Sequence, residues 1–417
     1  MGNIFIKNRS GLVLVTVLWV VVLLIVIVAV VGRNSRVDTK LCIYDIDSLR
    51  CRWACQAGVE TTAAILNDDD KASDCLTDLW ADSEDDLNDV ELQDCLFTVK
   101  VYDESSKLNI NTVTKNQLLS LPDMTEEIAA AIIDWRDSDD NPSVGGAEAG
   151  YYENMRYRYS IRNGNLRTIR ELLLVKGVTA SLLYGPPVTQ SLDIEEQDDV
   201  NKGWIWYLSC YSYDKNKDAE EEERVNINDA SEEQLQSSLS VKKSHAKWIV
   251  DNRPKDGYKS IADLINKNSP KKSSDEDGDE AQQIDLETFD NIADKITITG
   301  DERIAGRVNI NTAQRTVLTA VLGGGDTGKQ LANNIITYRE SLFVGMESIA
   351  EIMNVEGITI DRFKGIANSI TTRSDVYTVH SDARADRGGP DGFTLKTEAV
   401  IDRSSTPYTI LYWYQKS

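Results

Sequence analysis

Residues 12–31 form an apolar run without a charged side chain. At about 1.5 Å per residue, a helix of this length spans about 30 Å, the hydrocarbon thickness of a bilayer. Beyond the run, apolar residues recur at spacings of three and four: Cys42, Ile46, Leu49, Trp53 and Ala57. Because these positions share one helical face, we expect a single helix over 12–67. Its first half, 12–32, would cross a membrane, and its second half, 33–67, would lie on a soluble domain.

A cleaved secretory signal is the alternative interpretation of this apolar run. Such signals have a shorter apolar stretch and end in small residues that a signal peptidase accepts. Here the run ends in Ala29-Val-Val-Gly-Arg33, which favours a retained membrane anchor. Positive charges lie on both sides of the run, so they do not fix its orientation.

Alternating apolar and polar residues predict a small antiparallel sheet whose strands are far apart in the sequence. After an acidic loop, the first strand is expected at 97–102. Three more alternating runs near the end are typical of a β-meander: 376–383, 393–401 and 408–414. We expect segments 68–107 and 373–417 to form one sheet, with the helix around Trp53 packed on it.

The phrase Asn-Ile-Asn occurs three times between these strands, which indicates an internal repeat. Each copy is followed by short apolar stretches separated by turns, such as Val175-Lys-Gly-Val-Thr179 and Val355-Glu-Gly-Ile-Thr359. We expect short helices, inserted into the sheet over 108–372 as three units: 108–190, 225–290 and 308–372. The last asparagine of each phrase is expected to cap a helix: Asn111, Asn228 and Asn311.

Charge and motif content narrow the possible functions. The chain has 68 acidic and 45 basic residues, a net charge of −23, which repels phosphate backbones. Its two histidines exclude sites built on several imidazole ligands. No Gly-x-Ser-x-Gly, P-loop or His-Glu-x-x-His motif occurs, so we do not expect an enzyme.

One acidic segment differs from the other charged runs. Oxygen-bearing side chains alternate at Asp137, Asp139 and Asn141, and Glu148 follows a glycine turn. Loops that wrap Ca²⁺ have such a pattern, although the offsets are not those of an EF-hand. The alternative is a solvated loop in a very acidic protein. The runs 195–199, 220–223 and 275–280 lack glycine turns and are interpreted as linkers.

All six cysteines lie beyond the apolar run: Cys42, Cys51, Cys55, Cys75, Cys95 and Cys210. Disulfides are permitted if that side of the membrane is oxidising. Cys51 and Cys55 are one helical turn apart, a geometry that does not readily close a bridge. Cys75 and Cys95 flank the acidic loop and are the candidate pair.

The start of the chain resembles the leader of type IV pilins and type II secretion pseudopilins. The stretch Lys7-Asn-Arg-Ser-Gly11 precedes Leu12 and the apolar helix. In those families a prepilin peptidase cuts after the glycine. The resemblance implies a leader at 1–11 and cleavage between Gly11 and Leu12. Most members carry Glu at the fifth mature position, where this chain has Thr16.

Thr16 and the Asp-Trp-x-Asp-x-Asp segment from Asp134 are together similar to the K-type minor pseudopilins, the general secretion pathway protein K family. That family implies an α+β fold: a pilin-like long helix on a small antiparallel sheet, with a large inserted helical domain. The inserted units resemble SAM-like and helix-hairpin-helix subdomains. The resemblance also implies a structural calcium site with these ligands: Asp137, Asp139, Asp140 and Glu148.

The function implied by this resemblance is that of a minor pseudopilin at the tip of the type II secretion pseudopilus, where it helps start assembly for protein export. Its partners would be other minor pseudopilins, the prepilin peptidase and the inner-membrane secretion machinery. The chain would cross the inner membrane once, with its soluble domain in the periplasm. One alternative is a membrane-anchored DNA receptor that uses its helical hairpins, although nucleic-acid binding fits the negative charge poorly. Another is an anchored scaffold unrelated to secretion.

Overall fold

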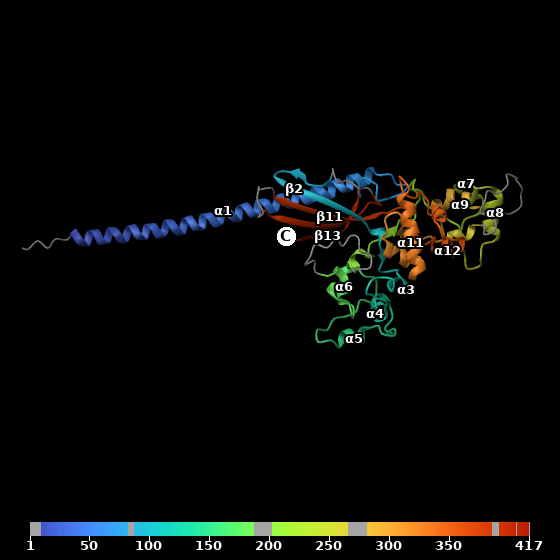
Figure 1. Ribbon diagram of the computed structural model, residues 1–417, viewed down its shortest axis with the longest axis horizontal. Helices are drawn as coiled ribbons and strands as arrows, with labels where there is room; N and C mark the ends of the chain where they lie inside the picture. Colours follow the sequence, from blue (N-terminus) through green and yellow to red (C-terminus); the bar gives the residue numbers. More distant parts are fainter. Residues whose placement is uncertain are drawn as a thin grey trace, which may run out of the picture.

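The computed structural model describes residues 10–81, 87–186, 202–265, 282–385, 392–405 and 407–416. Helix α1 (Ser10–Asp68) is continuous over 59 residues, and its first half projects away from the body of the molecule (Figure 1). The side chains of 13–31 are exposed along this projection. Among the described residues, α1 is the one helix long and apolar enough to cross a membrane. The predicted long apolar helix is therefore confirmed.

The second half of α1 packs on a five-stranded sheet with the order β1-β2-β11-β12-β13. Every neighbouring pair is antiparallel, which confirms the predicted antiparallel sheet. Its strands are β1 (Val90–Leu92), β2 (Cys95–Asp103), β11 (Val376–Ala385), β12 (Thr394–Asp402) and β13 (Thr409–Lys416). The alternation of apolar and polar residues does not predict β1, which is only three residues long.

Strands β2 and β11 are neighbours although a large helical region separates them in the sequence. Val101 lies opposite Val379, and Asp103 lies opposite Tyr377. The helical region leaves the sheet at the end of β2, through the 3-10 helix η1 (Glu104–Ser106), and returns at the start of β11. Such an insertion is tolerated because the entropic cost of closing a loop grows only logarithmically with its length.

The face of α1 that packs on the sheet is the opposite of the predicted one. Cys51, Ala54, Cys55 and Val59 are fully buried against the sheet, whereas Trp53 is 67% exposed. This face of α1 is buried because its small residues let the helix axis approach the strands closely. A Cβ atom on Gly58 would lie 2.5 Å from the Ser381 hydroxyl oxygen.

Four of the five residues on the predicted apolar face are exposed, whereas the fifth, Ala57, is half-buried and packs against the core between the helix and the sheet. We call Cys42, Ile46, Leu49 and Trp53 the outer stripe. All four side chains are exposed in the structure. Their spacing identified a helical face correctly, but apolar size did not identify the face that is buried.

The inserted region contains three units of short helices. In Figure 1 the second and third units lie beyond the end of the sheet, and the first unit lies to one side of it. The first unit has β3 (Leu108–Asn109), α3 (Lys115–Leu118), α4 (Glu126–Arg136), α5 (Ala149–Glu153), η2 (Ile169–Leu174), α6 (Ala180–Tyr184), η4 (Trp204–Trp206) and β4 (Leu208–Ser209). The second has β6 (Val225–Asn226), α7 (Glu232–Leu239), α8 (Lys243–Asp251), η5 (Ile261–Leu264), α9 (Leu286–Ile292), η6 (Ala293–Lys295) and β7 (Ile296–Thr297). The third has β9 (Val308–Asn309), α10 (Arg315–Val321), α11 (Gly325–Glu340), η7 (Ile349–Asn354), α12 (Ile360–Ile366) and β10 (Ile370–Thr371).

Each unit closes on itself through a two-residue parallel bridge that begins at its Asn-Ile-Asn phrase. Strand β3 pairs with β4, β6 with β7, and β9 with β10. A further antiparallel bridge joins β5 (Tyr213–Asp214) to β8 (Ile304–Ala305), outside the three units. The middle isoleucine of each phrase is fully buried in the common core: Ile110, Ile227 and Ile310. The repeat seen in the sequence is thus a repeat of structure.

The prediction that the last asparagine of each phrase caps a helix is wrong. Helices α3 and α7 are capped instead by Thr114 and Ser231, which lie further along the chain. Each asparagine side chain pairs with the backbone of a distant residue in its own unit. The Asn111 amide oxygen accepts from the Leu166 N–H at 2.7 Å, and its Nδ2 donates to the Leu166 carbonyl at 3.0 Å. Asn228 pairs in the same way with Tyr258.

An arginine near the end of one helix completes each unit. The Arg253 guanidinium donates to the carbonyl oxygens of Ile227 at 3.0 Å and Ala230 at 2.7 Å. Arg136 and Arg339 make the equivalent pair of bonds in the first and third units. These bonds satisfy carbonyl groups at a turn where the backbone has no regular partner.

Candidate functional site

Three carboxylates converge at the end of α4 and the start of α5: Asp134, Asp137 and Glu148. Each offers an oxygen, and these oxygens lie within 4.8 Å of one another. Asp134 belongs to the last turn of α4, Asp137 is the residue that ends α4, and Glu148 is the residue before α5. We call this group the carboxylate site.

Asp134 organises the loop between the two helices. Its carboxylate accepts from the backbone N–H of Ser143 at 3.1 Å and of Ala147 at 2.8 Å. A Cβ on Gly146 would lie 1.9 Å from Asp134 Oδ2, so the close approach requires glycine. Lys176 Nζ donates to the carbonyl oxygens of Gly145 and Gly146, both at 3.0 Å. The lysine of the Val-Lys-Gly-Val-Thr turn therefore holds the loop from the other side.

The other two carboxylates lack partners that balance their charge. Asp137 Oδ1 and both oxygens of Glu148 are buried, and none accepts a hydrogen bond within the described residues. Burial raises the pKa of Glu148 to about 7, and the charges of Asp137 and Asp134 add to the shift. Burial likewise raises the pKa of Asp137. Buried carboxylates without donors are costly unless a cation joins them.

The donor set fits a hard cation such as Ca²⁺, which takes oxygen ligands only. The structure brings together two of the four residues expected as ligands, Asp137 and Glu148. Asp139 and Asp140 lie outside the group and are exposed: Asp139 accepts from the Asn141 N–H at 2.8 Å, and Asp140 accepts from Asn163 Nδ2 at 3.0 Å. Asp134 takes their place. Its spacing of three from Asp137 on a helix would have indicated that both lie on one face.

A second group of carboxylates, Asp69, Asp74 and Asp78, has a different character. Arg403 Nη2 lies 2.5 Å from Asp74 Oδ1, and Arg403 Nη1 lies 3.4 Å from Asp69. The Tyr377 hydroxyl donates to Asp74 at 2.6 Å. Arg403 pairs with two of the three carboxylates, and these contacts fasten the loop after α1 to the sheet.

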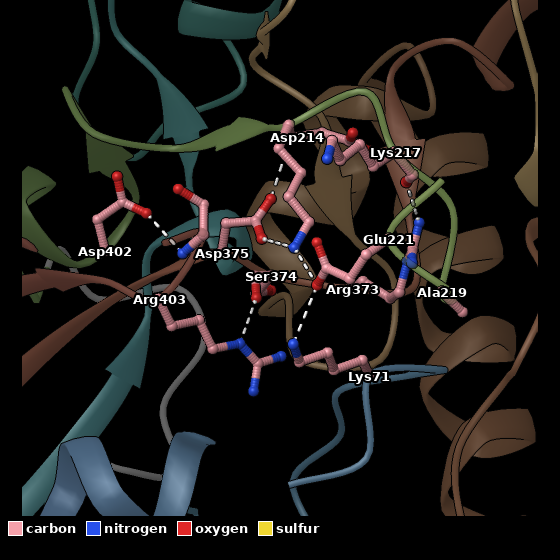
Figure 2. A network of polar contacts seen from close by, with 12 residues as sticks. Lys71, Asp214, Lys217, Ala219, Glu221, Arg373, Ser374, Asp375, Asp402 and Arg403 are labelled. Carbon is pink, nitrogen blue, oxygen red and sulfur yellow. Dashed lines mark hydrogen bonds and ion pairs between the residues drawn. The ribbon is translucent and has the colours of Figure 1, made fainter. Parts of the chain in front are cut away.

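A network of ion pairs joins the loop after α1 and the start of β11 to the inserted region (Figure 2). Glu221 lies 3.0 Å from Lys71, in the loop after α1, and 2.6 Å from Lys215. Lys215 also lies 3.5 Å from Asp375, just before β11. The backbone N–H of Arg403 donates to the carbonyl of Asp375 at 2.8 Å. The run 220–223 was expected to be a linker. It contains Glu221, which joins the loop after α1 to the inserted region.

Deeper in this network, the Asp214 carboxylate lies between two buried arginines. Arg224 Nη1 is 2.7 Å from Asp214 Oδ1, and Arg307 Nη1 is 2.9 Å from Asp214 Oδ2. Burial raises the pKa of Asp214, but the guanidinium groups of Arg307 and Arg224 outweigh it and hold this pKa well below its usual range. The compact network fixes the inserted region relative to the sheet.

The remaining expectations concern the cysteines and the leader. All six cysteines lie within the described residues, and all are free. The predicted Cys75–Cys95 pair is wrong, because the Cys75 sulfur contacts Asp78 and Thr77 whereas the Cys95 sulfur lies 3.6 Å from that of Cys51. Gly11 and Leu12 lie in the helical backbone of α1, and residues 1–9 of the expected leader are outside the described residues. The acidic runs 195–199 and 275–280 are outside them too.

Comparisons with known proteins find a family similarity for part of the inserted region. Residues 103–184, which include the carboxylate site and the first unit from β3 to α6, match the family model of type II secretion system (T2SS) protein K. A search of curated proteins finds no match. Among solved structures, the chain is similar to one in the crystal structure of the GspK–GspI–GspJ complex from the type 2 secretion system of enterotoxigenic Escherichia coli. The two share 13% identity at a TM-score of 0.48, over 89% of this chain and 98% of that one. Residues 103–184 of this chain are therefore similar to the type II secretion system protein K family.

Proposed function

We propose that this protein is a minor pseudopilin that lies at the tip of the type II secretion pseudopilus and helps start its assembly, and thereby the export of folded proteins across the outer membrane. The observation that carries the proposal is the joining of three parts in one chain. An apolar helix runs unbroken onto a pilin-like sheet, and a protein K segment is inserted between β2 and β11. In this function α1 anchors the chain once in the inner membrane, and the body lies in the periplasm.

The outer stripe of α1 supports assembly with other pseudopilins. Leu49 is 53% exposed and Trp53 is 67% exposed, although both lie beyond the apolar run 12–31. Exposed apolar residues aligned along a helix favour packing against another helix. The partners we propose are other minor pseudopilins. The helices of the subunits would pack along α1, from the membrane to the outer stripe.

Two features favour the tip over an internal position. Thr16 stands where most pilins carry a glutamate, and its hydroxyl donates to the Val13 carbonyl of its own helix at 2.8 Å. It therefore offers no charge to the N-terminal amine of a neighbouring subunit. The second and third units of the inserted region extend beyond the sheet at the end away from the free part of α1 (Figure 1), where they would block a subunit above.

The carboxylate site would stabilise this inserted region by binding Ca²⁺. Asp134, Asp137 and Glu148 would hold the ion, and the ion would offset the repulsion among their charges. The site joins the end of α4 to the start of α5 across the loop that Asp134 and Lys176 organise. We propose a structural role for the metal and no catalytic activity for the protein.

Sequencing of the mature N-terminus tests the proposed function. With prepilin peptidase present, the mature chain should begin at Leu12 and retain α1. A Gly11→Val variant should accumulate uncut, whereas a Ser10→Ala variant, changed one residue earlier, should be processed like the wild type. A mature chain that begins after 31 would identify a cleaved secretory signal, and this would refute a pseudopilin. Co-purification of the wild type with minor pseudopilins, and its loss for the uncut variant, would support the assembly role.

A further inference from the structure

The Cys51 and Cys95 sulfur atoms lie 3.6 Å apart between α1 and the sheet. Cys51 is on the buried face of α1, and Cys95 is the first residue of β2. Both side chains are fully buried in the core between the helix and the sheet. A disulfide has an S–S distance of about 2.05 Å, so the two sulfurs must approach by about 1.5 Å. Small rotations about the two Cα–Cβ bonds supply such a movement.

The backbone around the pair is held in place independently. Arg50 Nη1 lies 3.2 Å from Asp94 Oδ2, so the residues that precede the two cysteines already link the same helical turn to the same strand end. Cys95 also lies opposite Leu92 in β1 and Ala385 in β11, which fixes its position in the sheet. The two cysteines are therefore positioned by the fold and do not depend on their own contact to meet.

The other buried cysteine of α1 has a different environment. The Cys55 thiol, one turn after Cys51, donates to the backbone carbonyl of Ser381 at 3.2 Å and lies 3.5 Å from that of Leu395. Cys75 contacts Asp78 and Thr77, Cys42 is exposed, and Cys210, which directly follows β4, is half-buried and free. The geometry thus selects Cys51 and Cys95 among the six cysteines.

We propose that Cys51 and Cys95 form a disulfide in the mature protein, which links the second half of α1 covalently to the pilin-like sheet. This inference rests on the proposed function, because it requires the body to lie in an oxidising compartment such as the periplasm. The bond would close a loop across 44 positions of the chain and would hold α1 on the sheet when force is applied along the helix.

The oxidant is a protein disulfide of the dithiol oxidoreductase class, or oxidised glutathione in a purified system. One cysteine thiolate attacks the oxidant disulfide, forms a mixed disulfide and releases the first oxidant thiol. The second cysteine then attacks the mixed disulfide, forms the Cys51–Cys95 bond and releases the second oxidant thiol. The two cysteine protons end on the two released thiols. The protein loses two electrons, and the oxidant gains them.

Oxidation is expected during folding and not after it. Burial raises the pKa of Cys51 to about 12, so the thiolate that must attack is scarce once the core has closed. The reduced, folded chain should therefore react slowly with oxidised glutathione, and a chain that folds in the same buffer should react quickly.

Peptide mapping of the full chain tests the bond directly. The protein is purified from membranes, denatured in N-ethylmaleimide without reductant, and digested with trypsin and Glu-C. Cleavage after Arg52 separates Cys51 from Cys55, and cleavage after Glu91 separates Cys75 from Cys95. The expected result is a linked peptide pair that contains Cys51 and Cys95, with N-ethylmaleimide on the other four cysteines. Purified chain that folds in a glutathione redox buffer should give the same pair.

The possible results separate the two proposals. If the pair forms in glutathione but both cysteines are alkylated in protein from cells, the disulfide proposal fails and the periplasmic location is contradicted. If the pair forms in neither sample, the disulfide proposal fails and the proposed function is untouched.

As a second measurement, dithiothreitol should lower the Tm of the wild type by roughly 5–10 °C. The shift should disappear in Cys51→Ser and remain in Cys210→Ser; a shift of equal size in both would overturn the proposal.

Discussion

The side-chain amide of Asn311 pairs with the backbone of Met346 through two hydrogen bonds, as two peptide groups do. The Asn311 amide oxygen accepts from the Met346 N–H at 2.9 Å, and its Nδ2 donates to the Met346 carbonyl at 2.9 Å. The pairing recurs between Asn111 and Leu166. A side chain thus supplies the backbone partners that a short loop lacks, and this explains why every unit needs an asparagine at this position.

Replacement of Asn311 should destabilise the third unit. Asn311→Ala leaves a buried N–H and a buried carbonyl of Met346 without partners, so the free energy of unfolding should fall by about 2–4 kcal/mol. Urea denaturation of the soluble body measures the change. The exposed Asn354, in the same unit, provides the control: Asn354→Ala should change stability by less than about 0.5 kcal/mol. Equal losses in the two variants would contradict the structural role of the pairing.

Calcium should stabilise the body through the carboxylate site. Saturating Ca²⁺ at about 100 times its Kd should stabilise the wild type by about 2.7 kcal/mol, and a chelator should remove the effect. Glu148→Gln removes one buried charge and should weaken calcium binding tenfold or more, as measured by isothermal titration calorimetry.

Two exposed neighbours are matched controls for the calcium experiment. Asp139→Asn and Asp140→Asn also remove one charge each, but both residues lie outside the carboxylate site. Their calcium affinities should stay within about threefold of the wild type, a change of less than ~0.7 kcal/mol. Loss of binding in these variants, as well as in Glu148→Gln, would restore the ligand set expected from the sequence.

Asp103 should give the body a pH-dependent stability. Burial raises its pKa to about 6, although hydrogen bonds from Thr312 and Ser374 oppose the shift. The folded state therefore binds a proton more tightly than the unfolded state, so this group lowers the free energy of unfolding as pH rises from about 4 to about 6. In Asp103→Asn this contribution is absent. The stability of the variant relative to the wild type should thus be lowest at pH 4 and should rise towards pH 7 in thermal melts; a constant difference would argue against the raised pKa.

The outer stripe should contribute to binding and not to folding. Trp53→Ala should leave the free energy of unfolding within about 0.5 kcal/mol, because the side chain is largely exposed. Its affinity for partner minor pseudopilins should fall by roughly 30-fold or more, a loss of about 2 kcal/mol. Arg52→Ala changes an exposed neighbour on another side of α1 and is the control. Equal binding by wild type and Trp53→Ala would exclude the outer stripe from the interface.

The features that sequence patterns predicted here depend on local repetition. The length of the apolar run and the alternation in β2, β11, β12 and β13 each persist over several residues, so α1 and the sheet could be predicted. The buried face of α1 could not, because close approach at Gly58 favours small residues over large apolar ones. The two-residue bridges of the helical units are too short to give an alternating pattern.

Only part of the carboxylate site could be predicted, because local sequence patterns do not show how the loop folds. Asp137 and Glu148 follow from the acidic segment, whereas the choice of Asp134 over Asp139 depends on how the loop turns back onto α4. The asparagine pairings depend on residues 35 or 55 positions away in two of the units, and nothing in the phrase itself names them. The meeting of Cys51 with Cys95 requires the helix to lie on the sheet. The SAM-like and helix-hairpin-helix assignment of the units stays a prediction.

The opposition of Asp103 and Tyr377 across β2 and β11 has a consequence for how such a chain could arise. A reverse turn of a few residues could join these two positions, and no strand pairing of the sheet would change. The helical region thus occupies the position of a hairpin loop between β2 and β11. Duplication or deletion of whole units within it would alter the size of the inserted region while α1 and the sheet kept their shape.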